Sequence, residues 1–141
     1  MSTYTPSSAD RRSIGRFCES AVADYLTAKG YTIVKRGFTV KGGEIDLIAE
    51  DDATILFVEV KGRTDGDHIR RFGRPAMAVN AAKREHLLFA AKEYIRRTGN
   101  HKKPRLDVAE VYMTPVEAIT DTDIELWIAL NIRYYPAAFR G

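Results

Sequence analysis

Two carboxylates and a lysine stand in two apolar segments that are close in the chain. Asp46 opens the run 46–50, and Glu59 and Lys61 close the run 55–61. Because side chains alternate along a strand, Glu59 and Lys61 share one face with Ile55 and Phe57. The other face takes Leu56, Val58 and Val60. A strand that is apolar on both faces is buried, and charged side chains are rarely buried unless they are paired. Charged residues at the end of such a strand are therefore candidates for a functional site.

The two runs predict a hairpin in which the charges face one another. If Glu50 pairs with Ile55, the antiparallel register places Asp46 opposite Glu59 and Glu44 opposite Lys61. Two adjacent buried carboxylates either share a proton or share a cation, and Mg²⁺ usually takes one or two carboxylates with several waters. A one-residue slip would move Asp46 to the other face. The alternative for Glu59 and Lys61 is a solvated ion pair at a strand end.

Asp46 followed by Glu59-Val60-Lys61 resembles the PD-(D/E)xK signature of restriction-endonuclease-like nucleases. The segments 43–48 and 57–61 are similar to the YraN family of small bacterial proteins, which is related to Holliday-junction resolvases. Three positions depart from that family's usual pattern: Cys18 replaces a glycine, Gly62 a threonine and Leu106 a phenylalanine. The resemblance extends from about residue 15 to about residue 112. Further matching residues are Gly30-Tyr31, Phe72-Gly73, Pro75, Ala78-Val79, Lys83 and Arg105 to Val108.

The resemblance implies a metal-dependent endonuclease that hydrolyses phosphodiester bonds in DNA. Branched, Holliday-junction-like DNA is one expected substrate, and DNA is expected rather than RNA. Asp46, Glu59 and the Val60 carbonyl would hold Mg²⁺ or Mn²⁺, and Lys61 would position water or offset charge. A resolvase cuts two symmetric strands, so a homodimer is expected. The alternative is a module on the same fold that binds nucleic acid or a partner without catalysis.

Three further residues are candidates for supporting roles. Glu19 is either an exposed helix residue or, as the resemblance implies, part of the metal site. Lys83 either points toward the site or extends its stem along apolar surface. Glu44 supports the site through the hairpin register. Asp107 is interpreted mainly as a structural hydrogen-bond acceptor, and otherwise as a partner of the site.

Basic and aromatic side chains outside the hairpin suggest contact with nucleic acid. The charged loop 62–74 either binds phosphates or is a solvated loop, and its candidates are Arg63, Arg70, Arg71 and Arg74. Basic residues near the end of the second helix complement its dipole or extend this surface. Aromatic residues in segment 131–141 cover a core edge, form a dimer contact or stack on bases.

Composition is that of one globular domain. The chain has 141 residues, a formal net charge of +3 and a pI of about 9.0, mildly basic as for a nucleic-acid partner. Its single cysteine, Cys18, excludes an internal disulfide, predicts a buried thiol and suits the cytoplasm. No apolar stretch is long enough to span a membrane. Residues 1–12 predict a flexible tail before one nuclease-like domain, 13–141.

The predicted fold class is α/β, a restriction-endonuclease-like mixed sheet flanked by helices in the order α-β-β-β-α-β-β. Apolar spacing predicts a first helix capped by Ser13 and stopped by Gly30, and a second from Pro75 to about Arg97. Strands are predicted at 31–38, 46–50, 55–61, 106–113 and 124–130, with a bend at 41–43 and an irregularity at Gly37.

Overall fold

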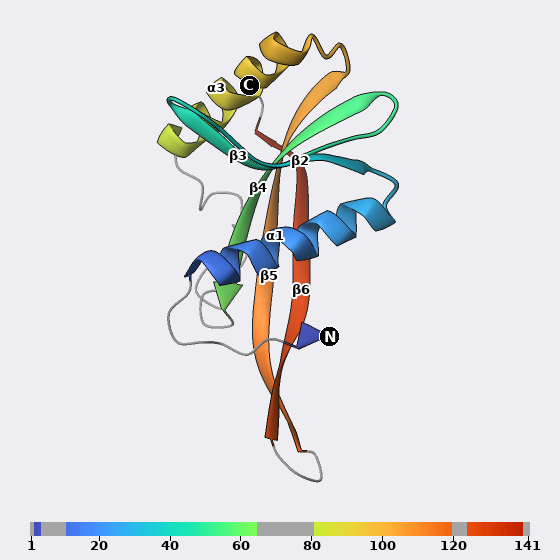
Figure 1. Cartoon of the computed structure of the whole chain (residues 1–141), viewed down its shortest axis with the longest axis vertical. Helices are drawn as coiled ribbons and strands as arrows, with labels where there is room; N and C mark the ends of the chain where they lie inside the picture. The colour runs from blue at the N-terminus through green and yellow to red at the C-terminus, as the bar shows by residue number, and fades with distance from the viewer. Residues whose placement is uncertain (1, 4–10, 65–80, 120–123, 140–141) are drawn as a thin grey trace.

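A mixed sheet with a helix packed on each face organises the chain (Figure 1). The structure, a computed structural model, describes residues 2–3, 11–64, 81–119 and 124–139. The six strands lie in the order β1-β6-β5-β4-β3-β2. β4 and β5 are parallel, and the other neighbours are antiparallel. In chain order the elements are β1 (Ser2–Thr3), α1 (Arg11–Ala28), β2 (Thr32–Val40), β3 (Gly43–Glu50), β4 (Thr54–Thr64), α3 (Ala81–Thr98), β5 (Lys103–Ile119) and β6 (Ile124–Phe139).

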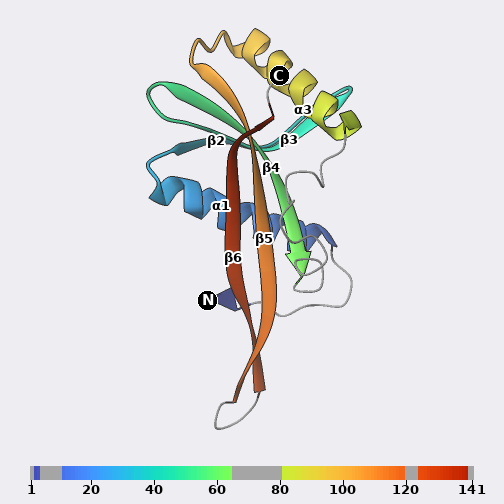
Figure 2. The same ribbon diagram turned by 180° about the vertical axis from the view of Figure 1, so that it is seen from behind.

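The two faces of the sheet carry separate apolar cores. On one face α1 buries Cys18, Val22 and Leu26 against the inner strands. On the other, α3 buries Leu87 and Tyr94. Figure 2 shows the sheet from behind, with β5 and β6 in front of α1. The strand residues of the α1 core are Leu47, Ala49, Leu56, Val58, Ala109 and Val111, and those of the α3 core are Phe38, Ile45, Ile48, Ile55, Phe57 and Leu106. Burying each large side chain contributes roughly 1.5–3 kcal/mol.

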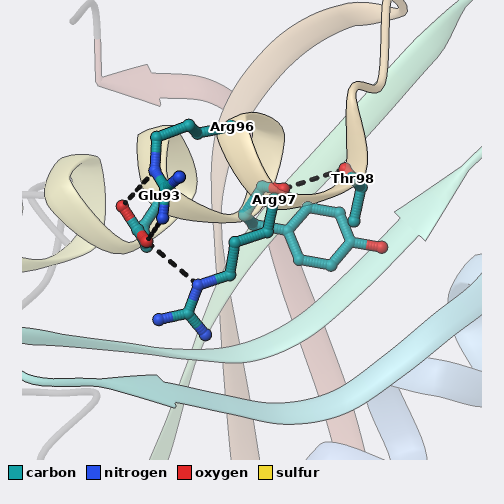
Figure 3. A network of polar contacts seen from close by, with 5 residues as sticks. Glu93, Arg96, Arg97 and Thr98 are labelled. Atoms are coloured by element: carbon teal, nitrogen blue, oxygen red, sulfur yellow. Dashed lines mark hydrogen bonds and ion pairs between the residues drawn. The ribbon is translucent and has the colours of Figure 1, made fainter.

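The end of α3 is closed by contacts within the helix (Figure 3). Arg96 and Arg97 both pair with Glu93, and the Thr98 hydroxyl donates to the Tyr94 carbonyl at 2.8 Å. These two arginines lie in the last turn, where cations complement the helix dipole. Just beyond the helix, Lys102 pairs with Glu50 at 3.2 Å. The position of Arg96 and Arg97 in the last turn agrees with the dipole interpretation, and contact of this basic cluster with nucleic acid stays a prediction.

Among the described residues the element order is as predicted except for β1, and several boundaries were wrong. α1 begins at Arg11, so Ser13 lies inside the helix and is not its N-cap. Ser2 and Thr3 pair with β6, while the flexibility of the remaining tail stays a prediction because residues 4–10 lie outside the described part. The start of the second helix at Pro75 also falls outside it. None of the helices that the structure describes is long and apolar enough to cross a membrane.

β5 and β6 are much longer than their sequence patterns indicated. They pair from Leu106 opposite Phe139 to Ile119 opposite Ile124. In the described part of the chain, β4 pairs with β5 up to Thr64 opposite Met113, while β5 and β6 stay paired up to Ile119 opposite Ile124 and β1 joins β6 (Figure 1). Segment 131–141, which the sequence did not predict as a strand, therefore belongs to β6 as far as Phe139. Its backbone groups find partners in β5, a contact that local periodicity does not encode.

Candidate active site

The hairpin of β3 and β4 adopts the predicted register at its turn end, but the predicted pairs of Asp46 with Glu59 and of Glu44 with Lys61 are absent from the described ladder. Pairing runs from Glu50 opposite Ile55 to Leu47 opposite Val58, and there it stops. The next residue, Asp46, uses its side chain instead: its Oδ2 accepts a hydrogen bond from the Val60 N–H at 2.8 Å. Asp46 is therefore anchored beside the segment of β4 that carries Glu59. The turn is closed by Asp51, whose carboxylate accepts hydrogen bonds from the N–H groups of Ala53 and Thr54.

Strand β3 changes its facing at Asp46. Ile45 belongs to the α3 core, whereas Leu47, two residues later, belongs to the α1 core. In a regular strand these two side chains would share a face. Across on β2, Gly37 stands between the partners of Ile45 and Leu47 and has a φ of 73°, a conformation that suits glycine. The predicted irregularity at Gly37 is confirmed, and it falls opposite the candidate ligand Asp46.

Glu59 is buried with one oxygen unsatisfied. The residue is only 2% exposed, and it follows Ile55 and Phe57 on the α3 face as predicted. Its Oε1 lies 3.4 Å from Lys83 Nζ and 3.6 Å from Lys61 Nζ. Its Oε2 is buried and has no hydrogen-bond partner within the described residues. A buried acceptor without a donor is costly, so this oxygen indicates a place for a proton or a cation.

The pKa of Glu59 reflects this environment. The pKa of Glu59 is raised from 4.5 to about 7, first by burial and then by the neighbouring charge of Asp46, against the opposing effect of Lys83 and Lys61. The pKa of Asp46 is also raised, by burial first, although the Val60 N–H and the Lys83 charge lower it. The two carboxylates therefore compete for negative charge, as the sequence predicted for an adjacent pair.

Lys83 connects α3 to this acidic pair. Its Nζ lies 3.4 Å from Glu59 and 3.6 Å from Glu44, whose side chain is 60% exposed. Burial alone would lower the pKa of Lys83, but the carboxylates of Glu59, Glu44 and Asp46 outweigh it and raise the pKa. Of its two interpretations, the structure places Lys83 at the site. A cavity of about 320 Å³ opens beside it, with Glu44 and His86 in its lining.

Glu19 adds a fourth carboxylate from α1. Burial raises the pKa of Glu19, and the negative charges of Asp46 and Glu44 raise it further. Arg36 and Arg16 oppose these effects. Glu19 is therefore half-buried and within electrostatic reach of the pair. Glu19 is thus not fully exposed, and its part in a metal site stays a prediction.

The donor set fits a hard divalent cation with few protein ligands. In an extended strand the N–H and C=O of one residue point toward the same neighbouring strand. The Val60 carbonyl is thus directed to the side where its N–H meets Asp46. Two carboxylates, one of them with an unsatisfied oxygen, and a carbonyl suit Mg²⁺ or Mn²⁺ with water filling the other positions. Within the described ranges, no three His, Cys, Asp or Glu side chains form a metal-binding cluster.

Several candidate phosphate contacts are not located. Arg70, Arg71 and Arg74 lie outside the described residues. Arg63 is part of β4 opposite Tyr112, but its side chain is not described. The role of these arginines stays a prediction. Gly62, where the resembling family has threonine, continues β4 opposite Val111, so the change does not interrupt the strand.

A second polar network was only partly anticipated. Asp107 is fully buried and accepts two bonds of 2.9 Å from Arg105, one from the Tyr134 hydroxyl and one of 2.9 Å from the Ala137 N–H. Asp107 is thus a structural acceptor, the interpretation favoured from the sequence. Tyr134 also stacks on Tyr25 with ring centroids 5.4 Å apart, so this aromatic residue of segment 131–141 covers the core.

Sequence reasoning missed Glu110, which is fully buried on β5 opposite Lys61 of β4. It accepts a hydrogen bond from the Tyr112 hydroxyl at 3.2 Å, and the Arg133 guanidinium lies 5.3 Å from the Tyr112 ring centre. A charged residue in an otherwise apolar strand was the available signal. The neighbours that β6 supplies were not foreseeable, because segment 131–141 was not predicted as a strand.

The fold and the site define a mixed α/β protein with an acidic, lysine-flanked centre where two strands diverge. Comparison with known proteins is more specific: residues 18–111 match the Uncharacterised protein family UPF0102, and the chain belongs to this family. The resemblance to YraN proteins is thereby confirmed at the family level, since YraN proteins form the same family. The matched region contains all six residues of the centre, which are Glu19, Glu44, Asp46, Glu59, Lys61 and Lys83.

The match to several bacterial relatives covers most of the length of each relative. A UPF0102 protein of Symbiobacterium thermophilum is 45% identical over 105 residues, or 74% of this chain and 86% of the relative. One from Caldanaerobacter subterraneus is 41% identical, covering 75% and 84%. One from Caldicellulosiruptor saccharolyticus is 34% identical, covering 82% and 95%. The similarity therefore covers about three quarters of this chain or more and most of each relative.

Proposed function

We propose that this protein is a Mg²⁺- or Mn²⁺-dependent endonuclease of the PD-(D/E)xK type, with a restriction-endonuclease-like fold, acting on DNA. The observation that carries the proposal is the anchoring of Asp46 beside Glu59 at the open end of the β3–β4 ladder. The unsatisfied Oε2 of Glu59 supports a cation at this position. The βαβ arrangement of β4, α3 and β5 is compatible with this fold class.

The chain's own residues have separable tasks in this proposal. Asp46, Glu59 and the Val60 carbonyl would hold the metal, which when bound supplies charge stabilisation at the phosphate and a more acidic water. The Val60 N–H orients Asp46, since it fixes one carboxylate oxygen at 2.8 Å. Lys61 lies on the Glu59 side of the site, where its ammonium offsets negative charge on a phosphate or positions water.

Lys83 and Glu19 would adjust the charge of the site. With the metal absent, Lys83 balances Glu59 and Glu44. A divalent cation near Glu59 would repel this ammonium, leaving Lys83 available to a phosphate oxygen beside the cavity that it lines. Glu19 extends the negative potential on the α1 side. Because ligands must be ionised, metal affinity is expected to rise with pH as Glu59 loses its proton.

A non-catalytic module that binds nucleic acid or a partner is the second candidate function. The ion pairs of Lys83 with Glu59 and Glu44 favour it, because they satisfy part of the acidic centre without any cation. Such a protein would bind DNA in a salt-dependent way through its basic residues. Mutation of Asp46 would then leave its affinity unchanged.

Cleavage assays with labelled four-way junction, flap, duplex and single-stranded DNA separate the two. Each is incubated with Mn²⁺, Mg²⁺ or a chelator, using wild type, Asp46→Asn and Asp52→Asn. The amide oxygen introduced by Asp46→Asn can still accept from the Val60 N–H, so the fold is retained. Asp52, exposed in the same hairpin, is the matched control. Cleavage that needs metal, survives Asp52→Asn and is lost in Asp46→Asn supports the nuclease.

Cleavage retained in Asp46→Asn would refute the assignment of the metal site. DNA binding without cleavage, equal in all three proteins, would favour the non-catalytic module. The ranking of substrates tests the proposal of branched DNA. Sedimentation of the protein with and without a junction tests the proposed homodimer.

A further inference from the structure

A second cavity lies away from the acidic centre, between α3 and the first residues of β4 and β5. Its volume of about 570 Å³ is within the range of small-molecule pockets. Thr54 and Phe57 reach it from the start of β4, whereas Glu59 and Lys61 lie farther along that strand. The two sites are therefore separate. The apolar walls of this second cavity come from Phe57, Leu88, Ala91, Ile95, Pro104 and Leu106.

Three cations border this cavity from two elements. Lys92 comes from α3, and Lys103 and Arg105 come from β5. No acidic side chain is among the described residues that line it. Lys92 and Lys103 are exposed, so their ammonium groups can move toward a ligand at the mouth. The lining combines apolar walls with positive charge contributed by both elements.

The wall on the β5–β6 side is rigidly built. Arg105 is held by two bonds of 2.9 Å to the buried Asp107, which also accepts the Ala137 N–H at 2.9 Å. Ala137 lines the cavity with a φ of 52°, a left-handed conformation that a residue with a side chain rarely adopts. Backbone strain of this kind persists only where surrounding contacts fix it, and it concentrates at ligand sites. Asp107 uses two of the five N–H donors of the guanidinium.

From this arrangement we infer that the cavity binds a small organic phosphate with an apolar body. A phosphate dianion matches the two exposed ammonium groups of Lys92 and Lys103 better than a single carboxylate does, whereas the charge of Arg105 is largely offset by Asp107. The apolar walls favour a ligand that carries a hydrophobic group with the phosphate. Inorganic phosphate lacks that group, and an uncharged nucleoside lacks the charge. The inference is independent of the proposed nuclease activity.

Titration calorimetry with the full-length protein tests the inference. The probes are adenosine monophosphate, adenosine, inorganic phosphate and decanoate. We expect adenosine monophosphate to bind at least about tenfold more tightly than either of its parts, since charge-assisted and apolar contacts both contribute. We expect Lys92→Glu combined with Lys103→Glu to weaken this binding by about tenfold or more. The control, Lys35→Glu with Lys41→Glu, makes the same charge change at exposed positions outside the cavity lining.

Each other result overturns the inference in a different way. Binding that is lost in Lys83→Gln but unchanged in the cavity variant would place the phosphate at the acidic centre. Tight binding of decanoate alone would assign the cavity to an apolar carboxylate. Equal loss in the cavity variant and its control would show only a dependence on overall charge. Failure of all four probes to bind would remove the cavity as a phosphate site, with no bearing on DNA cleavage.

Discussion

Replacing Glu59 by glutamine removes a carboxylate that the fold buries in an unfavourable environment. Glu59 is 2% exposed, and burial together with Asp46 raises its pKa from 4.5 to about 7 despite two nearby lysines. Glutamine has nearly the same shape and can still accept a hydrogen bond from Lys83. The substitution therefore tests the energetic cost of charge at this position with little change in packing.

The sign and size follow from the linkage between protonation and folding. Below about pH 4.5 the folded and unfolded chains both keep the Glu59 proton, and between about 4.5 and 7 only the folded chain keeps it. Wild-type stability therefore falls as pH rises through this window and levels off above it. At about 1.4 kcal/mol per pKa unit, the loss is about 3 kcal/mol. Glu59→Gln avoids this loss and should exceed wild type by about 2–3 kcal/mol near pH 8.

Urea unfolding from about pH 4 to about pH 9 measures the difference in the free energy of unfolding. Glu85→Gln, at an exposed position of α3, is the matched control and should change stability by less than about 0.5 kcal/mol. Adding Mg²⁺ near pH 8 should stabilise wild type and not Glu59→Gln, since a cation offsets the buried charge. A variant that is less stable than wild type at about pH 8, or a difference independent of pH, would refute this account of Glu59.

The remaining predictions concern packing and burial at four other positions. Gly43→Ala should destabilise the fold by about 1–3 kcal/mol, because its Cβ would stand 2.2 Å from a backbone carbonyl oxygen of α3. Gly15→Ala in α1, where the space around the glycine is open, should stabilise the fold by about 0.5–1 kcal/mol. Urea unfolding measures both changes. Burial raises the pKa of Cys18 to about 11, so iodoacetamide should label it only on unfolding, and rapid labelling of the folded protein in mass spectrometry would contradict this. Tyr134→Phe should cost about 1–3 kcal/mol in thermal or urea unfolding, because buried Asp107 loses a donor; unchanged stability would show that this bond contributes little.

The hairpin and its carboxylate pair could be predicted because the information is local. Asp46 and Glu59 are joined by a short turn, and the alternation of apolar residues fixes which side chains share a face. The Asp51 turn and the pairing of Glu50 with Ile55 then set the register without help from the rest of the chain. The motif that identified the family lies within these residues.

The partners of that pair could be named from the sequence but not placed. Lys83 follows Glu59 by 24 positions, and its helical phase allowed either the site or apolar surface. Its position depends on how α3 packs, which is fixed by close approach of the helix to Gly43 and by its buried face. Glu19 likewise reaches the site only because α1 packs across the opposite face of the sheet.

The sequence by itself determined the charged hairpin, the faces of β4 and the membership of the family, because alternation and short-range pairing are local properties of a chain. Tertiary structure alone decided the length of β6, the network around Asp107 and the cavity beside Lys92 and Lys103. These features arise from contacts between segments far apart in the chain. Their geometry depends on backbone pairing and helix packing, which residue types constrain only collectively.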